Sequence, residues 1–198
     1  MGVVESGLLA ANPWVTRRAI NVDEYYRMAK SGLFAEGDRV ELIEGALIAM
    51  TPIGDDHVGT VEVLTYHLVT AIRKRGIVSV QNPLRLDDAT EPEPDFVVYK
   101  PRADFYRKNR RGVEDVLLVI EVADSSVDYD KKVKVPLYAK HGIAEYWLVR
   151  LDTRVVEVHR GPGPNGYASM HEIRAGQDLE LLLLPGITIP AATVLRAP

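Results

Sequence analysis

The stretch that decides the fold reads Glu93-Pro94-Asp95-Phe96-Val97-Val98, followed after a basic segment by Leu118-Val119-Ile120-Glu121-Val122. Both runs are rich in the β-branched and aromatic residues typical of strands, and the second fits a central strand that is covered on both faces. Each run nevertheless carries one carboxylate. Burying a carboxylate costs several kcal/mol unless a cation or hydrogen bonds compensate for the lost water. We therefore interpret Asp95 and Glu121 as cation ligands.

Working outward from these strands, the hydrophobic pattern predicts further helices and strands. Asn21 is a good N-cap with an acid three positions later, and apolar residues recur at helical spacing from His57 to Arg75. A hairpin with its turn at Glu44-Gly45 is predicted over 40–50. Helices are predicted over 21–30, 57–75 and 125–142, and further strands over 77–81, 94–99, 116–122, 145–150, 154–160, 167–174 and 178–184. This order indicates an α/β or α+β fold, with a mixed central β-sheet flanked by helices and additional strands in the C-terminal third.

Composition narrows the class of protein. The 198 residues include 46% apolar and 26% charged side chains, which is ordinary for one soluble globular domain. We expect a loose arm over 1–20 and a single domain over 21–198. The absence of cysteine excludes thiolate catalysis and Cys-based zinc sites. The sequence contains neither an apolar run of about 18 residues nor a basic signal-peptide start, so we expect a cytoplasmic protein without membrane contact.

A third segment, beyond the two acid-bearing strands, completes a known pattern. It runs from Tyr129-Asp130-Lys131-Lys132-Val133-Lys134 through Gly142-Ile143-Ala144-Glu145-Tyr146-Trp147. Together with Asp95 and Glu121 it resembles the PD-(D/E)xK nuclease superfamily, and within it the Uma-two family of restriction-endonuclease-like proteins. The resemblance covers roughly residues 20–195. It implies a restriction-endonuclease-like fold and a metal-dependent endonuclease that hydrolyses phosphodiester bonds in DNA.

The resemblance also implies a metal site. The ion would be Mg²⁺, with Mn²⁺ as the alternative, held by Asp95, Glu121 and the peptide carbonyl of Val122, and a metal-bound water would be the nucleophile. Mg²⁺ is commonly bound by one or two carboxylates and keeps several waters, which agrees with such chemistry. Glu44 is marked by the same resemblance as a catalytic acid. Its position beside a hairpin turn, taken alone, favours a solvated surface residue.

The catalytic lysine departs from the usual superfamily pattern. Ala123 stands two positions after Glu121, where a lysine is usual. The resemblance places the lysine in the following helix, best at Lys134, with Lys131 and Lys132 as secondary candidates. An α-helix turns about 100° per residue, so Lys132 and Lys134 point to nearly opposite sides, whereas Lys131 and Lys134 can share a face.

Two further residues bear on this interpretation. Pro136 removes a helical hydrogen bond and clashes with the preceding turn, at a cost of about 3 kcal/mol, so we expect the helix to kink or restart beside Lys134. An exposed ion pair between Lys134 and Asp130 is the competing interpretation of the lysine.

His57 matches a recurrent family histidine, and a capping or core imidazole is its equally weighted alternative. The other histidines show no metal-ligand spacing, so we interpret them as structural.

Basic residues cluster in two places that suit contact with DNA. One cluster ends the predicted helix over 57–75, and the other lies in the basic and aromatic segment 100–111, between the acid-bearing strands. Such residues bind phosphates and stack on bases, but charge runs are commonly solvated surface, and the net charge of −4 leaves the partner open. The candidate DNA contacts are Arg73, Lys74, Arg75, Arg107, Lys108, Arg110 and Arg111.

The leading hypothesis is therefore a magnesium-dependent endodeoxyribonuclease. The alternative is a nuclease-fold protein without catalysis, acting as a nucleic-acid-binding or protein-interaction module. An unrelated small-molecule enzyme has little support, because the sequence has no glycine-rich phosphate loop and no evident nucleophile with a partnered base. We also expect a homodimer, since enzymes of this fold that cut both strands are often paired and the β-rich C-terminal third could supply an interface.

Overall fold

A computed structural model describes residue 14 and residues 16–108 and 111–196. Contacts divide the chain into two compact units. The first unit comprises the chain up to Thr51 together with Arg85–Pro92, and the second comprises Pro52–Leu84 together with the chain from Glu93 onward. The arm predicted over 1–20 lies mostly outside the described residues, and the single domain over 21–198 stays a prediction.

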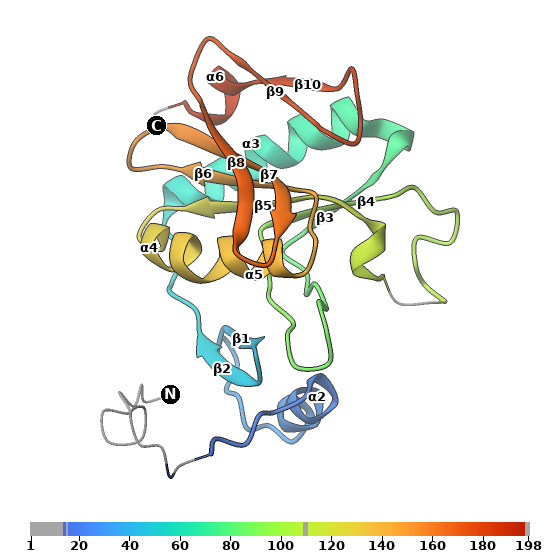
Figure 1. Ribbon diagram of the computed structural model, residues 1–198, viewed down its shortest axis with the longest axis vertical. Coiled ribbons are helices and arrows are strands. Elements are labelled where there is room, and N and C mark those ends of the chain that lie inside the picture. The colour runs from blue at the N-terminus through green and yellow to red at the C-terminus, as the bar shows by residue number, and fades with distance from the viewer. Residues whose placement is uncertain (1–13, 15, 109–110, 197–198) are drawn as a thin grey trace. The chain divides into compact units, whose positions relative to one another are not determined.

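The first unit contains a capped helix, α2 (Val22–Lys30), which confirms the predicted helix (Figure 1). The Asn21 side chain accepts a hydrogen bond from the Glu24 N–H at 2.8 Å, and the Glu24 carboxylate accepts one from the Asn21 N–H at 3.1 Å. This reciprocal capping box satisfies two N–H groups that would otherwise lack helical partners. The helix therefore begins where the sequence predicts.

A tight hairpin forms the rest of the first unit's regular structure. β1 (Val40–Ile43) and β2 (Ala46–Ala49) pair antiparallel across the two-residue turn Glu44-Gly45, as predicted. Both turn residues have positive φ, 47° and 76°, which is the type I′ geometry that matches the twist of hairpin strands. A Cβ atom at Gly45 would come within 2.4 Å of the Ala19 Cβ, so this position requires glycine.

A six-stranded mixed sheet forms the centre of the second unit. The strand order is β3-β4-β5-β6-β7-β8, in which β5 and β6 are parallel and the other neighbours are antiparallel. The strands are β3 (Ile77–Val80), β4 (Phe96–Tyr99), β5 (Val116–Ala123), β6 (Glu145–Arg150), β7 (Val155–Gly163) and β8 (Gly166–Ile173). Every residue of β5 is buried, which confirms the predicted central strand.

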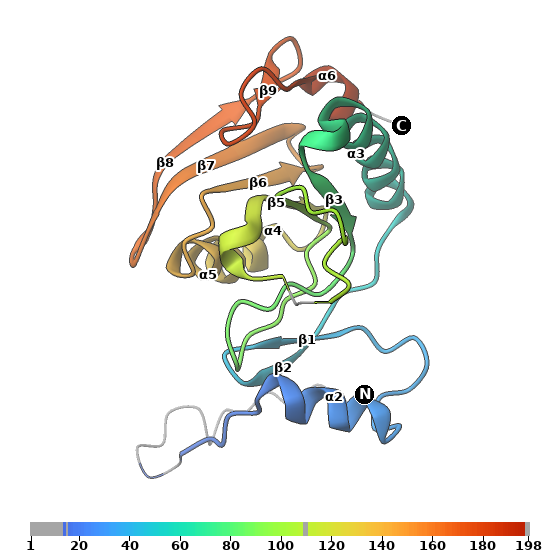
Figure 2. The same ribbon diagram turned by 90° about the vertical axis from the view of Figure 1, so that its right-hand side faces the viewer.

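Helices cover both faces of this sheet (Figures 1 and 2). α3 (Asp55–Ile72) lies on one face, and the parallel connection between β5 and β6 covers the other face. That connection consists of α4 (Val127–Tyr129), the π-helical turn η3 (Asp130–Lys134) and α5 (Val135–Lys140). Parallel neighbours need a crossover of this kind, whereas antiparallel neighbours do not. The predicted class, with a mixed sheet flanked by helices, is therefore confirmed.

The main core lies between α3 and the sheet. α3 buries apolar residues at helical spacing, namely Val61, Leu64, Leu68 and Ile72. Even-numbered residues of β4 and β5, such as Phe96 and Ile120, point into this core. Because side chains alternate across a strand, the odd-numbered neighbours, including Glu121, face the η3 side of the sheet. No helix in the described part of the chain is long and apolar enough to cross a membrane.

Small C-terminal elements complete the core on the α3 side. β9 (Asp178–Glu180) and β10 (Thr188–Pro190) form a two-stranded sheet, and α6 (Ala191–Val194) follows. α6 and β10 both contact α3. The strand predicted over 178–184 ends at Glu180, and β10 was not predicted, because a three-residue strand containing proline lacks the alternation that identifies longer strands. Two short 3₁₀ turns, η1 (Arg73–Arg75) and η2 (Val113–Asp115), precede β3 and β5.

Candidate active site

The register of β4 and β5 brings the two predicted acids together. Phe96 pairs with Ile120, and one further step along this antiparallel register places Asp95 opposite Glu121. Each carboxylate also accepts a hydrogen bond from a backbone N–H of the other segment. The Asp95 N–H donates to Glu121 Oε2 at 3.1 Å, and the Val122 N–H donates to Asp95 Oδ2 at 2.8 Å. Sheet pairing therefore places the two acids side by side.

Asp95 accepts two further hydrogen bonds from side chains. His57, in the first turn of α3, places Nε2 at 3.1 Å from Asp95 Oδ2, and Gln81 Nε2 donates to Asp95 Oδ1 at 3.2 Å. Gln81 follows β3 with a positive φ of 48°, a conformation that costs non-glycine residues free energy. The strained residue, Gln81, is thus the one whose side-chain amide contacts the Asp95 carboxylate.

Glu121 faces a lysine and a tyrosine from the crossover connection. Lys134 Nζ lies 3.3 Å from Glu121 Oε1, and the Tyr138 hydroxyl donates to the same oxygen at 2.9 Å. These residues, together with Asp95 and His57, are each at most 7% exposed. The structure therefore brings together the histidine, both acids and the favoured lysine of the sequence analysis in one buried cluster. The exposed ion-pair interpretation of Lys134 is wrong, because the side chain is buried.

The turn that carries Lys134 is shaped by Pro136. Proline has no N–H, and its ring clashes with the carbonyl four residues earlier, which here belongs to Lys132. The preceding turn widens in response, and the Val135 N–H donates to the Asp130 carbonyl five residues back, as in a π-helix. α5 then begins at Val135, which confirms the restart predicted beside Lys134. The wide turn directs Lys134 at Glu121.

Pro136→Ala should therefore separate activity from stability. Alanine restores an N–H and removes the ring, so the wide turn can tighten toward α-helical geometry and displace Lys134 slightly, which keeps its ion pair with Glu121 but spoils the alignment that catalysis needs. If the predicted nuclease activity is present, we expect its rate to fall about tenfold or more while the free energy of unfolding stays within about 1 kcal/mol, because alanine is the better helix former. Cleavage rates and urea denaturation measure the two quantities. Equal loss of both would contradict a positioning role for Pro136.

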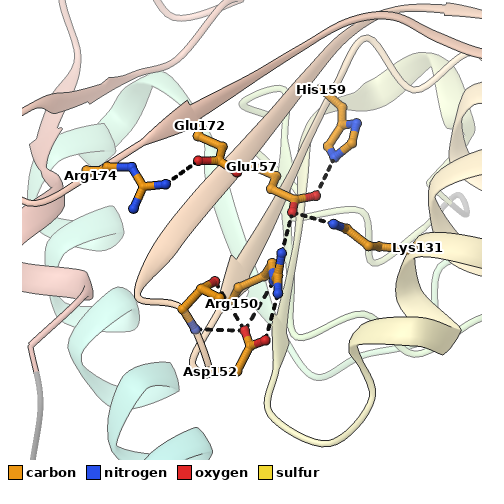
Figure 3. Close-up of polar contacts among 8 residues, drawn as sticks. Lys131, Arg150, Asp152, Glu157, His159, Glu172 and Arg174 are labelled. Atoms are coloured by element: carbon orange, nitrogen blue, oxygen red, sulfur yellow. Dashed lines mark hydrogen bonds and ion pairs between the residues drawn. The ribbon is translucent and has the colours of Figure 1, made fainter.

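The two secondary lysine candidates have other partners. Lys132 is exposed and pairs with Asp128 one turn away, at 2.8 Å. Lys131 Nζ lies 2.7 Å from Glu157 Oε1 on β7, as Figure 3 shows. Glu157 lies opposite Leu148 in the sheet, and Leu148 lies opposite Glu121, so the two glutamates occupy one row on the same face. Each glutamate thus pairs with one lysine of η3, Glu121 with Lys134 and Glu157 with Lys131.

Glu157 is the buried centre of a second ionic cluster, whose members Lys131 and Asp152 are exposed (Figure 3). Arg150 donates to Glu157 Oε1 at 3.1 Å and also to Asp152, and His159 Nε2 lies 3.5 Å from Glu157 Oε2. Burial disfavours the charged Glu157 carboxylate, but the hydrogen bonds from Lys131 and Arg150 outweigh this effect and hold its pKa below the ordinary value. The cluster ties η3 to β7 through a charged side chain.

The same cluster predicts a loss of stability in mild acid. Burial lowers the pKa of His159 below its ordinary value of 6.5, although Glu157 opposes the shift. The unfolded chain therefore binds a proton at His159 at higher pH than the folded chain does, and the folded state loses stability as the pH falls below about 6.5. We expect His159→Phe to flatten the pH dependence of urea unfolding between about pH 7 and 5.5. His171→Asn, at an exposed position of β8, is the control and should leave the slope unchanged.

The charge of the Asp95–Glu121 cluster suits a cation. His57 Nε2 lies 3.1 Å from Asp95 Oδ2, and His57 Nδ1 is buried without a hydrogen-bond partner among the described residues. Glu121 faces the Lys134 ammonium directly, and Asp130 of η3 is a further buried carboxylate beside Asp95 and Glu121 in the charge of this region. Burial raises the pKa of Tyr146 well above the ordinary value, and the negative charges of Asp130, Glu121 and Asp95 add to this shift.

The donor set fits magnesium better than metals that need several protein ligands. Within the described ranges, no group of three or more His, Asp or Glu side chains is arranged to hold a metal ion. Mg²⁺ typically uses one or two carboxylates and fills its remaining positions with water and substrate oxygens. Asp95 and Glu121 provide that pair, and the Val122 backbone lies beside Asp95 through its N–H. The Val122 carbonyl stays the predicted third ligand.

Glu44 is the one predicted catalytic residue that is part of the other compact unit. Glu44 belongs to the first unit, where it is exposed at the hairpin turn and its N–H donates to Thr90 Oγ1 at 3.3 Å. Its catalytic role stays a prediction.

Sequence reasoning missed Gln81, Tyr138 and Glu157. Tyr138 follows Lys134 by one helical turn, so the helical spacing of an i, i+4 pair was the available signal.

The candidate DNA contacts divide by their partners. Both terminal nitrogens of Arg75 donate to the Pro185 carbonyl at 3.1 Å, and Arg111 donates to Ser79 Oγ at 2.9 Å with its guanidinium 4.7 Å from the Tyr99 ring centre. These two arginines therefore support the fold. The remaining candidates are Arg73, Lys74, Arg107 and Lys108, which are exposed, and Arg110, which lies outside the described residues.

The mixed sheet, the helices on both faces and the acids on neighbouring central strands define a protein of the restriction-endonuclease-like fold class. A solved structure of this kind, from Anabaena variabilis ATCC 29413, is described as "a putative nuclease belonging to DUF820". It matches with a TM-score of 0.65 and 16% sequence identity, over 89% of this chain and 97% of that chain. The likeness shows a shared fold. No curated protein matches the sequence.

The family assignment follows from the sequence of the whole domain. The Uma2 family, described as "Putative restriction endonuclease", matches residues 22–192. This match includes both acid-bearing strands and the lysine-bearing crossover. The chain therefore belongs to the Uma2 family, which confirms the resemblance stated from the motifs.

Proposed function

We propose that this protein is a Mg²⁺-dependent endonuclease that hydrolyses phosphodiester bonds in DNA. The observation that carries the proposal is the buried cluster of Asp95, Glu121 and Lys134 in a chain of the Uma2 family, where the Asp95 N–H and Lys134 Nζ contact the Glu121 carboxylate at 3.1 and 3.3 Å. A structural protein gains little from such a set, because replacing a buried ion pair by apolar residues of similar volume is often neutral or stabilising. A cluster of this composition is expected where charge is needed for chemistry.

The side chains divide the work of this reaction. Asp95 and Glu121, with the Val122 carbonyl, would hold Mg²⁺ or Mn²⁺. When bound, the ion would offset the negative charge that builds on the phosphate oxygens. Lys134 presents a fixed ammonium that stabilises the same charge, and in water-excluded surroundings such preorganised groups act strongly. His57 and Tyr138 hold the two carboxylates in their orientations through hydrogen bonds, which keeps both acids directed at one place.

Metal-dependent cleavage is the direct test. The purified protein should nick or cut supercoiled, linear duplex or single-stranded DNA in the presence of Mg²⁺ or Mn²⁺, and EDTA should stop the reaction. Sedimentation at micromolar concentration tests the homodimer that cutting of both strands would favour. Absence of cleavage on every DNA form, with metal supplied and the fold intact, would overturn the nuclease proposal.

One observation favours the second candidate, a non-catalytic nucleic-acid-binding module. All four oxygens of Asp95 and Glu121 already accept hydrogen bonds from protein groups, so a metal ion would have to share or replace these partners. Titration calorimetry with Mg²⁺ and Mn²⁺ separates the candidates. Binding that disappears in Asp95→Asn supports the nuclease, and no binding of either ion supports the module.

A further inference from the structure

A basic pocket of about 340 Å³ lies at the end of β4 opposite to Asp95. Its cations are Arg73, Lys74 and Arg102, its aromatic side chain is Phe105, and none of its lining residues is acidic. Ile77 at its base pairs with Tyr99, the last residue of β4, whereas Asp95 precedes the first. Four strand residues of about 3.3 Å each separate the two ends, so the pocket lies too far from Asp95 to hold the phosphate that is cut.

The backbone around this pocket is strained. Phe105 and Tyr106 have consecutive positive φ values of 50° and 59°, and Arg73 has a φ of 51°. Residues with a Cβ rarely adopt this left-handed conformation, and two in succession persist only where surrounding contacts hold them. Phe105, one of the residues in this conformation, is 62% exposed and lines the pocket. A strained backbone that carries an exposed large apolar ring opposes stability and therefore points to a function.

The contacts that hold the loop leave Phe105 in a defined position. The Tyr106 hydroxyl donates to the Lys100 carbonyl at 3.0 Å, and its ring centre lies 5.8 Å from that of Tyr99. Arg102 lies 4.5 Å over the Tyr106 ring and makes two hydrogen bonds, of 2.8 and 2.9 Å, to Asp104. Asp104 compensates the charge of Arg102. The charge that the pocket presents to a ligand therefore comes mainly from Arg73 and Lys74.

We propose that this pocket binds one unpaired nucleotide of DNA, with its phosphate on Arg73 and Lys74 and its base stacked on Phe105. Exposed aromatic rings beside basic side chains bind single strands because every base has a face that can stack, whereas bases inside a duplex are already stacked. The proposal rests on the nuclease function above and specifies its substrate. DNA with a single-stranded end, flap or gap would place a nucleotide here while another position of the strand meets Asp95 and Glu121.

Binding to labelled oligonucleotides tests the pocket separately from cleavage. The full chain carrying Asp95→Asn is titrated in EDTA against a single strand of about 12 nucleotides, the blunt duplex, and the duplex with a single-stranded overhang. Adding Phe105→Ala should weaken binding of the single strand and the overhang about tenfold or more, and should change duplex binding less than about twofold. Phe105→Trp should restore the affinity.

Matched substitutions identify the cause of any loss. Tyr66→Ala removes an equally exposed ring from α3, 67% exposed, and should leave all three affinities unchanged. Arg73→Gln with Lys74→Gln should weaken binding and lower the salt dependence by about two counterions, whereas Arg174→Gln, at an exposed position just after β8, should do neither. Thermal unfolding of each variant confirms that it is folded.

The outcomes distinguish the pocket from the nuclease proposal. Unchanged single-strand affinity in Phe105→Ala overturns the pocket, even where the unmutated protein cuts DNA. Selective loss of single-strand affinity supports the pocket, even where no cleavage is found, and the nuclease proposal then fails alone. A shift of Phe105→Ala from dimer to monomer in sedimentation, with DNA affinity unchanged, would overturn the proposal in favour of contact with a second copy of the chain.

Discussion

Asp95→Asn should abolish DNA cleavage and leave the protein folded. Asparagine keeps the size of the side chain and a carbonyl oxygen that can accept the hydrogen bond from the Val122 N–H, and the Gln81 amide can rotate to accept from the new NH₂ group. The negative charge that would bind a metal ion is lost. Because charge stabilisation of this kind contributes several kcal/mol to a transition state, we expect the cleavage rate to fall about a thousandfold.

The measurement compares initial rates of plasmid nicking in Mg²⁺ and in Mn²⁺, with urea denaturation of the same preparations. We expect the free energy of unfolding to change by about 1 kcal/mol or less. Asp128→Asn is the control, since this exposed carboxylate on α4 pairs with Lys132 outside the cluster and its loss should not affect cleavage. A rate for Asp95→Asn near that of the unmutated protein would remove Asp95 from the reaction and with it the proposed mechanism.

The two acids could be predicted from the sequence because the strands that carry them have a recognisable apolar pattern. A continuous apolar run is rare outside a covered strand, so one carboxylate inside Val116–Ala123 is conspicuous. The pairing of β4 with β5 is favoured because strands that follow one another in the chain commonly lie side by side, and alternation decides which side of the sheet Glu121 faces. Nothing in this step needs knowledge of distant contacts, and the structure confirms both strands.

The catalytic lysine was harder to predict, because the turn that carries it departs from regular α-helical geometry. Regular helical geometry could separate Lys132 from Lys134, but only the resemblance favoured Lys134 as the catalytic residue. The widened turn that aims Lys134 depends on where the helix can restart after Pro136, which is settled by contacts with β5 rather than by propensity. Pro136 therefore indicates from the sequence that the helix is irregular, whereas the direction in which Lys134 points depends on contacts with the sheet.

Residues that act through distant partners escaped prediction for a different reason. Glu157, in Val155-Val156-Glu157-Val158, has the alternation of a strand with one solvated face, yet it is 1% exposed because η3 covers that face. Its partners come from η3, β6 and β7, three segments whose proximity no local pattern reveals. Gln81 is similar, since its side chain matters only once β3 and β4 are paired.

Lys134→Met should be the most destabilising single substitution in the cluster. Methionine replaces the lysine stem at similar volume but removes the ammonium that faces Glu121, and that carboxylate remains buried. Removing one partner of a buried ion pair typically costs about 3–5 kcal/mol, because the other charge has lost its compensation. We expect a loss of this size in the free energy of unfolding, measured with urea in EDTA, together with loss of cleavage.

The adjacent lysine is the matched control. Lys132→Met removes an exposed ion pair from the same turn, and such pairs contribute about 0.3–0.5 kcal/mol in helices. The contrast between the two variants therefore measures burial and not helix propensity. In a double-mutant cycle, Lys134→Met combined with Glu121→Gln should recover much of the stability, since both charges are then gone. Equal, additive and small losses at both lysines would show that Lys134 and Glu121 are not coupled, and the lysine would then lose its proposed place beside the metal ligands.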